Sequence, residues 1–239
     1  MPPTVVLVHG AFAESSSWNG VLARLNDAEI PAIAFGNPLR SVAPDAEALS
    51  DRLRTIDGPV VLVGHSYGGM VITNVDPSAA EVLSAVYVCA FAPAIGESAS
   101  ELAARFPGST LGETLEPVRR GDAGETDLYI ASDRFHAQFC ADVNPHTAGL
   151  LAQTQRPITQ GALEEASSDE HCLWRDVPSY FVIGAGDRNI PAAAQRFMAE
   201  RAGSRGTLEI ADGSHAVAVA QPGPVAELVL DAVAVTAAA

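Results

Sequence analysis

The sequence has few cysteines and few positive charges. Its three cysteines are Cys89, Cys140 and Cys172; no two form a CxxC pair and their number is odd, so a disulfide framework is not expected. The chain carries 14 basic against 29 acidic residues, a formal net charge of −15. Because so acidic a chain repels a phosphate backbone, the sequence argues against nucleic acid as a partner.

The sequence also lacks any apolar run of the roughly 18 residues that a membrane-spanning helix needs, so no membrane partner is expected. The first residues, Met1–Thr4, carry neither the basic start nor the apolar stretch of a signal peptide. These absences predict a cytoplasmic protein, although a secreted protein after processing would look the same.

Apolar residues are abundant: they make up 48% of the 239 residues, against 18% charged ones. This composition can bury a large core, and no repeat or linker divides the chain, so we expect one domain over residues 1–239. Short apolar, β-branched runs recur at Thr4–Val8, Pro31–Phe35, Pro59–Val63, Ala85–Val88, Ser179–Ile183 and Thr207–Ile210. Each run is continuous rather than alternating, which is typical of strands buried on both faces of a parallel sheet.

Segments in which apolar residues have helical spacing separate these runs, around residues 18–25, 44–56, 191–198 and 225–233. Alternation of strands and helices predicts right-handed crossovers and a sheet covered by helices on both sides. The expected fold class is therefore α/β.

One long stretch, about 93–175, interrupts this alternation. It contains no convincing strand, and its helical candidates are Glu101–Phe106, Asp133–Cys140, Thr147–Thr154 and Gly161–Ala166. A loop of this length without structure is improbable inside a compact domain. We therefore expect a helical cap over about 93–175, set on a core formed by about 4–92 and 176–235.

The segment Val60–Gly69 is the most informative part of the sequence. An apolar strand leads directly into Gly64-His65-Ser66-Tyr67-Gly68, a Gly-x-Ser-x-Gly motif, and we expect a helix to follow. In this context the glycines allow so tight a turn that Ser66 adopts a strained conformation with its hydroxyl exposed. The pattern predicts that Ser66 is a nucleophile, and the alternative is a glycine-rich loop with a capping serine.

A second motif, His9-Gly10, ends the first predicted strand. A strand that ends this way can supply one backbone N–H to an oxyanion, and the residue after the nucleophile, Tyr67, can supply another. We expect His9 to shape the loop through hydrogen bonds rather than to act in catalysis.

A serine nucleophile requires an acid and then a histidine further along the chain. Asp187 follows the strand at 179–183, and His215 lies in a loop after the last strand. Asp176 and Asp212 are weaker candidates, because the first precedes its strand and the second is too close to His215.

The remaining histidines and cysteines have no spacing typical of a zinc site, so neither a metal nor a cofactor is expected. Most aromatic residues of the cap should belong to the core, but some must line the pocket because the cap covers the nucleophile. The residues expected to contact the substrate are Phe12, Phe135 and Trp174.

Taken together, His9-Gly10-Ala11, the motif around Ser66, Gly186-Asp187 and Gly213-Ser214-His215 resemble the α/β-hydrolase fold. The phrase His-Gly-Ala followed by Ser-Trp is similar to the small esterase branch that holds plant methyl-ester esterases, hydroxynitrile lyases and bacterial relatives. The resemblance implies Ser66 as nucleophile, His215 as base, Asp187 as the acid, and the Ala11 and Tyr67 amides as oxyanion donors.

The family normally has two more N-terminal strands, whereas this chain begins at the third. The resemblance therefore implies about six strands, mostly parallel.

These features predict a serine carboxylesterase acting on small to medium uncharged esters through an acyl-enzyme. The alternatives are a hydroxynitrile lyase, an acyltransferase or perhydrolase using the same triad, and a non-catalytic receptor of the same fold. The expected partner is a small-molecule ester; a homodimer is an option that the sequence leaves open.

Overall fold

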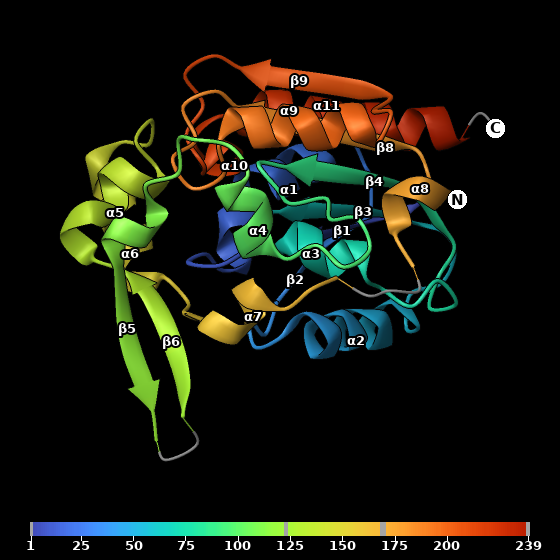
Figure 1. Ribbon diagram of the computed structural model, residues 1–239. Helices are drawn as coiled ribbons and strands as arrows, with labels where there is room; N and C mark the ends of the chain where they lie inside the picture. The colour runs from blue at the N-terminus through green and yellow to red at the C-terminus, as the bar shows by residue number, and fades with distance from the viewer. Residues whose placement is uncertain (1, 122–123, 168–170, 238–239) are drawn as a thin grey trace.

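Six parallel strands form the central sheet of the computed structural model, which describes residues 2–121, 124–167 and 171–237 (Figure 1). The strand order across the sheet is β2-β1-β3-β4-β8-β9. The strands are β1 (Thr4–Val8), β2 (Ala32–Phe35), β3 (Val60–His65), β4 (Val82–Val88), β8 (Ser179–Gly184) and β9 (Gly206–Ile210). Each expected strand is present, with bounds that differ from the prediction by no more than three residues.

Helices cover both faces of this sheet. They are η1 (Ser15–Trp18), α1 (Asn19–Asp27), α2 (Val42–Leu53), α3 (Gly68–Thr73), α9 (Ala192–Arg201), α10 (Val217–Ala220) and α11 (Pro222–Ala237). One face of β1, carrying Val5 and Leu7, packs with α1, α10 and α11. The other face, carrying Val6 and Val8, packs with α2, α3 and α9. The continuous apolar runs are explained by this burial on both sides.

The segment between β4 and β8 forms the cap. Its elements are α4 (Ala99–Ala104), η2 (Leu111–Thr114), β5 (Leu115–Arg120), β6 (Glu125–Ile130), α5 (Ser132–Phe139), α6 (Pro145–Thr154), β7 (Ile158–Thr159), α7 (Gln160–Glu164) and α8 (Leu173–Asp176). The four expected cap helices correspond to α4, α5, α6 and α7.

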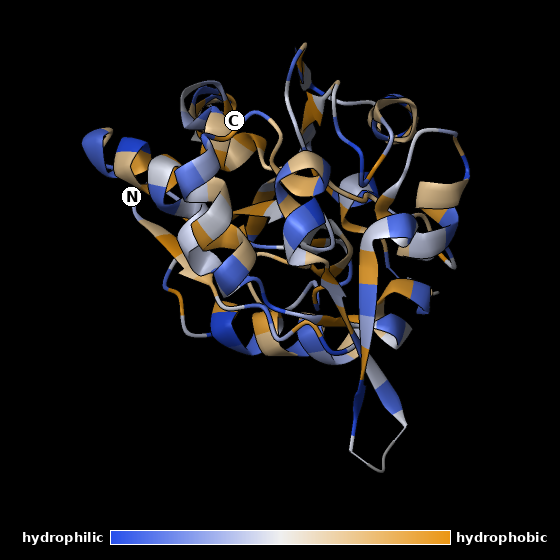
Figure 2. Cartoon of the chain, turned by 90° about the vertical axis from the view of Figure 1, so that its left-hand side faces the viewer, coloured by the Kyte–Doolittle hydropathy of each residue, from blue (hydrophilic) through white to orange (hydrophobic). Residues whose placement is uncertain are grey.

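The expectation that this segment contains no strand is wrong. β5, β6 and β7 form a three-stranded antiparallel sheet, and the β5–β6 hairpin extends away from the body of the molecule (Figures 1 and 2). Most of β5 is exposed, and it contains Pro117 and the charged pair Arg119-Arg120. Such a strand buries no continuous apolar run, so its sequence lacks the signal that marks the core strands.

Among the described residues, no helix is both long and apolar enough to cross a membrane.

Candidate active site

The turn between β3 and α3 holds Ser66 in an unusual backbone conformation. Its φ is 54°, in the left-handed region that residues other than glycine rarely adopt. The turn is tightly packed: a β-carbon on Gly68 would lie 2.3 Å from the carbonyl oxygen of Val8, and one on Gly69 would lie 2.0 Å from that of Phe91. Strain of this kind, fixed by its surroundings, is typical of functional sites.

The loop after β1 lies directly against this turn. A β-carbon on Gly10 would be 2.5 Å from Ser66 Cβ and 2.9 Å from the backbone nitrogen of Tyr67. Within the described parts of the chain, the amide N–H groups of Ala11 and Tyr67 donate to no protein acceptor. Two unused amide donors therefore flank Ser66, as an oxyanion site requires.

His9 holds this loop in shape. The backbone N–H of Asn37 donates to His9 Nε2 over 3.0 Å, so the proton is on Nδ1, which lies 3.0 Å from the carbonyl oxygen of Gly10. Burial lowers the pKa of His9 to about 4, which keeps the ring neutral and this pattern of donor and acceptor intact.

Asp187 and His215 form a buried pair at the carboxyl ends of β8 and β9. His215 Nδ1 and Asp187 Oδ2 are 2.7 Å apart, and their side chains are 1% and 0% exposed. The second carboxylate oxygen accepts the backbone N–H groups of Asn189 and Ile190, at 2.8 and 3.0 Å. Gln195 Nε2 also donates to Asp187 Oδ2, over 2.8 Å. With these donors the carboxylate is held in one orientation toward His215.

The other ring nitrogen of His215, Nε2, is buried and has no hydrogen-bond partner among the described residues. His65, the residue before Ser66, donates from Nε2 to the carbonyl oxygen of His215 over 2.9 Å, and the two rings have centroids 4.7 Å apart. Burial lowers the pKa of His65 well below its ordinary value. A neutral His65 therefore links the strand that carries Ser66 to the loop that carries His215.

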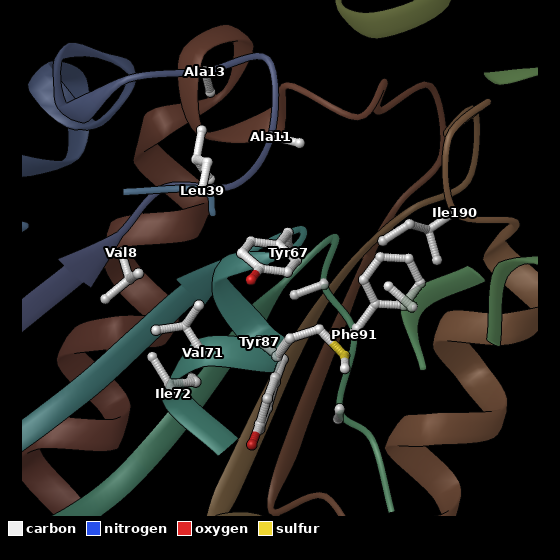
Figure 3. Packing of buried hydrophobic residues seen from close by; sticks show 14 of the residues in the cluster. Val8, Ala11, Ala13, Leu39, Tyr67, Val71, Ile72, Tyr87, Phe91 and Ile190 are labelled. Atoms are coloured by element: carbon white, nitrogen blue, oxygen red, sulfur yellow. The ribbon is translucent and has the colours of Figure 1, made fainter. Parts of the chain in front are cut away.

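A small pocket of about 70 Å³ opens at Ser66. Its walls come from the core and from the cap, and they consist of Ala11, Phe12, Ser66, Tyr67, Phe91, Ala99, Ser100, Ala103, Leu111, Leu163, Asn189 and Ile190. Figure 3 shows Ala11, Tyr67, Phe91 and Ile190 in this region. Pockets for drug-sized ligands occupy roughly 300–1,000 Å³, so this one suits a small group.

Two of the three expected substrate contacts lie elsewhere. Phe12 does line the pocket. Phe135 is fully buried and packs on Phe139, with ring centroids 4.9 Å apart. Trp174 donates from its indole N–H to the carbonyl oxygen of Pro93 over 2.7 Å. Neither Phe135 nor Trp174 is among the residues that form the pocket wall, because both are used in packing the cap.

Some residues that support the site are not indicated by the sequence. The hydroxyl of Tyr67 donates to Asp45 Oδ2 over 3.0 Å, which ties the residue after Ser66 to the start of α2. Asp45 is fully buried, and burial raises its pKa. Neither Asp45 nor Gln195 lies in a motif; only their contacts in the folded chain reveal them.

No cluster of three or more His, Cys, Asp or Glu side chains within the described ranges is arranged to hold a metal. The three cysteines are buried, and burial raises the pKa of Cys140 to about 12 and that of Cys172 to about 11. Their thiols are therefore protonated at neutral pH.

Comparisons with known proteins agree with this architecture. The alpha/beta hydrolase family model matches residues 5–228. The alpha/beta hydrolase nvfD of Aspergillus novofumigatus is 24% identical, over 97% of each chain. The structure is similar to polyneuridine aldehyde esterase (TM-score 0.81, 20% identity, 97% of this chain and 99% of the other). It is also similar to the Arabidopsis methylesterase protein MES16 (TM-score 0.78, 16% identity, with the same coverage).

Both solved structures share the fold of this chain. The family match spans nearly the whole chain, from β1 into α11. The protein belongs to the alpha/beta hydrolase family.

Proposed function

We propose that this hydrolase is a serine carboxylesterase that cleaves small to medium uncharged esters. Ser66 Oγ attacks the ester carbonyl carbon while His215 Nε2 takes the hydroxyl proton. The oxyanion accepts the N–H groups of Ala11 and Tyr67. The alcohol leaves with the proton from His215, and water, deprotonated by His215, then releases the carboxylic acid and restores Ser66.

One observation carries this proposal: His215 Nε2 is a buried nitrogen with no partner in the described part of the chain, on an imidazole whose Nδ1 is fixed by Asp187. A buried polar atom that is left unpaired costs free energy, so its retention favours a role in which it accepts a proton. Ser66, which has a strained backbone and lines the pocket, supplies the hydroxyl group that would donate that proton.

Two positions favour ester hydrolysis over cyanohydrin cleavage. Hydroxynitrile lyases of this fold resemble one another in having a threonine after the strand-end histidine and a lysine after the catalytic histidine. In this chain Gly10 follows His9, and Ala216 follows His215. Gly10 has no room for a side chain, because its β-carbon would collide with Ser66. Ala216 supplies no cation to stabilise cyanide.

The proposal is tested by comparing the wild type with Ser66→Ala. We expect the wild type to hydrolyse 4-nitrophenyl butanoate and to release no cyanide from mandelonitrile above the buffer rate. Ser66→Ala should lose ester turnover by at least about 10³-fold while keeping its unfolding temperature. Full activity in Ser66→Ala, or cyanide release that matches ester turnover and depends on Ser66, would contradict the proposal.

A further inference from the structure

The acid loop after β8 brings one amide side chain to the pocket. Asn189 is two residues beyond Asp187 and donates its backbone N–H to Asp187 Oδ1 over 2.8 Å. The residue is 3% exposed and forms part of the wall of the pocket at Ser66. Its side chain is therefore buried, close to the proposed acid, and beside the space that receives the substrate.

A cap residue, Gln138 of α5, fixes the orientation of this amide. Gln138 Nε2 donates to the carbonyl oxygen of Arg188 over 2.9 Å, and a carbonyl oxygen can only accept. Gln138 Oε1 accepts the Thr110 hydroxyl over 2.8 Å. The atom of Asn189 that faces Gln138 Nε2, at 2.8 Å, must then be the oxygen Oδ1.

Among the residues that the structure describes, this arrangement leaves the NH2 group of Asn189 without a partner. Within the described residues, Asn189 Nδ2 donates to no acceptor. Some unpartnered side-chain atoms of the protein are completely buried, but Asn189 Nδ2 is not one of them. Nδ2 therefore keeps contact with open space. Asn189 forms part of the pocket wall, so we infer that this open space is the pocket.

The rest of the pocket wall is mostly apolar. Apart from Asn189, its polar side chains are the hydroxyls of Ser66, Ser100 and Tyr67, and the Tyr67 hydroxyl is already bound to Asp45. A ligand that is entirely apolar would cover the Asn189 donor without pairing it. A buried donor left unpaired lowers affinity for such a ligand relative to one that carries a matching acceptor.

Resting on the proposed esterase function, we propose that Asn189 Nδ2 is a specificity-determining donor. It selects uncharged esters that carry one further oxygen acceptor, such as an ether or keto oxygen, near the ester group. The hydrogen bond binds this second oxygen, while the amides of Ala11 and Tyr67 serve the ester carbonyl. The preferred substrates are thus oxygenated small esters rather than simple alkyl esters of the same size.

Matched substrates that differ by one atom test this proposal. On the acyl side, 4-nitrophenyl methoxyacetate and 4-nitrophenyl butanoate differ by an oxygen in place of a methylene. On the alcohol side, 2-methoxyethyl acetate and butyl acetate differ in the same way. The measured quantity is the ratio of kcat/KM for the ether ester to that for the alkyl ester, because intrinsic reactivity cancels when this ratio is compared between variants.

Two variants remove the donor in different ways. Asn189→Asp keeps an oxygen toward Gln138 and replaces the NH2 group with an acceptor; Asn189→Leu removes both polar atoms. We expect both variants to lower the ratio about 3- to 10-fold in one of the two substrate pairs, as the loss of a neutral hydrogen bond implies. The pair that responds identifies the half of the substrate that lies beside Asn189.

Ratios within twofold of the wild type, in both substrate pairs and in both variants, would overturn the assignment. Failure of the proposed function has a different signature, since the wild type would then hydrolyse none of the four esters. Thermal unfolding of each variant separates a specificity change from a folding defect: a variant that unfolds at the assay temperature loses turnover of both members of a pair alike.

Discussion

Gly10 is the residue whose replacement most directly perturbs the site. A β-carbon there would lie 2.5 Å from Ser66 Cβ and 2.7 Å from the carbonyl oxygen of His65. We expect Gly10→Ala to displace the loop from the turn at Ser66, to lower kcat/KM by at least about 10²-fold, and to reduce the free energy of unfolding by about 1–3 kcal/mol.

Gly149 provides the matched control for Gly10→Ala. It lies inside α6, and nothing is within 4 Å of a β-carbon placed on it. Gly149→Ala should leave ester hydrolysis unchanged and raise the free energy of unfolding by about 0.5–1 kcal/mol, because alanine favours a helix more than glycine does. If Gly10→Ala behaved like Gly149→Ala in both measurements, the close packing of the loop on the turn would be irrelevant to function.

His9 and His65 predict a dependence of stability on pH. Burial lowers the pKa of His9 to about 4 and that of His65 well below its usual value. Below pH 6.5 the two histidines bind protons in the unfolded chain but not in the folded one, so the free energy of unfolding falls as the pH is lowered. Above pH 6.5 neither histidine makes the free energy of unfolding depend on pH.

When the pH falls from 7.5 to 5, each of these two histidines should lower the free energy of unfolding by about 2 kcal/mol. The raised pKa of Asp45 partly offsets this decrease. Urea unfolding at several pH values measures the trend. A free energy of unfolding that stayed level, or rose, between pH 7.5 and pH 5 would contradict the neutral, buried state of both rings.

Among the secondary-structure elements, the strands of the core can be predicted from the sequence more easily than those of the cap. Each core strand, such as Val60–His65, is buried on both faces, and a continuous apolar run is enough to mark it. The strand Leu115–Arg120 is largely exposed and includes a proline, so only its pairing with Glu125–Ile130 reveals it. Local sequence cannot show such pairing between exposed segments.

The cap is fastened to the core by a part-buried ion pair. Arg40 lies before α2, and its guanidinium is 2.6 Å from Asp127 of β6; it also donates to the carbonyl oxygen of Pro157 over 2.7 Å. The Arg40 and Asp127 side chains are 32% and 11% exposed. Removing the Asp127 side chain leaves the Arg40 guanidinium without this carboxylate, at a part-buried position where water only partly takes the place of the carboxylate.

We therefore expect Asp127→Ala to lower the free energy of unfolding by about 1–2 kcal/mol in urea titrations. The control is Arg134→Ala, which removes a pair with Asp133 whose side chains are 69% and 80% exposed; its effect should stay within about 0.5 kcal/mol. Equal effects of the two substitutions would show that Arg40 and Asp127 do not anchor the cap.

At the scale of the whole molecule, the site combines groups that are far apart in the sequence. Chain order alone indicated Ser66, Asp187 and His215, because the carboxyl ends of parallel strands meet at one edge of a sheet. Spacing could not indicate that Gln138 of α5 holds Asn189, since this contact arises only when the cap folds onto the core. Motifs could thus indicate the candidate residues of the site, whereas the shape of the pocket required the structure.

The role of Ser66 as nucleophile is tested by peptide mapping after reaction with a small alkyl phosphonate that reports activated serines. We expect one phosphonyl group per chain, located on Ser66, with loss of ester hydrolysis in proportion to labelling. His215→Ala should react at least about 10²-fold more slowly, because no base then takes the hydroxyl proton. A label on another residue, or a fully labelled protein that still hydrolyses esters, would contradict the account.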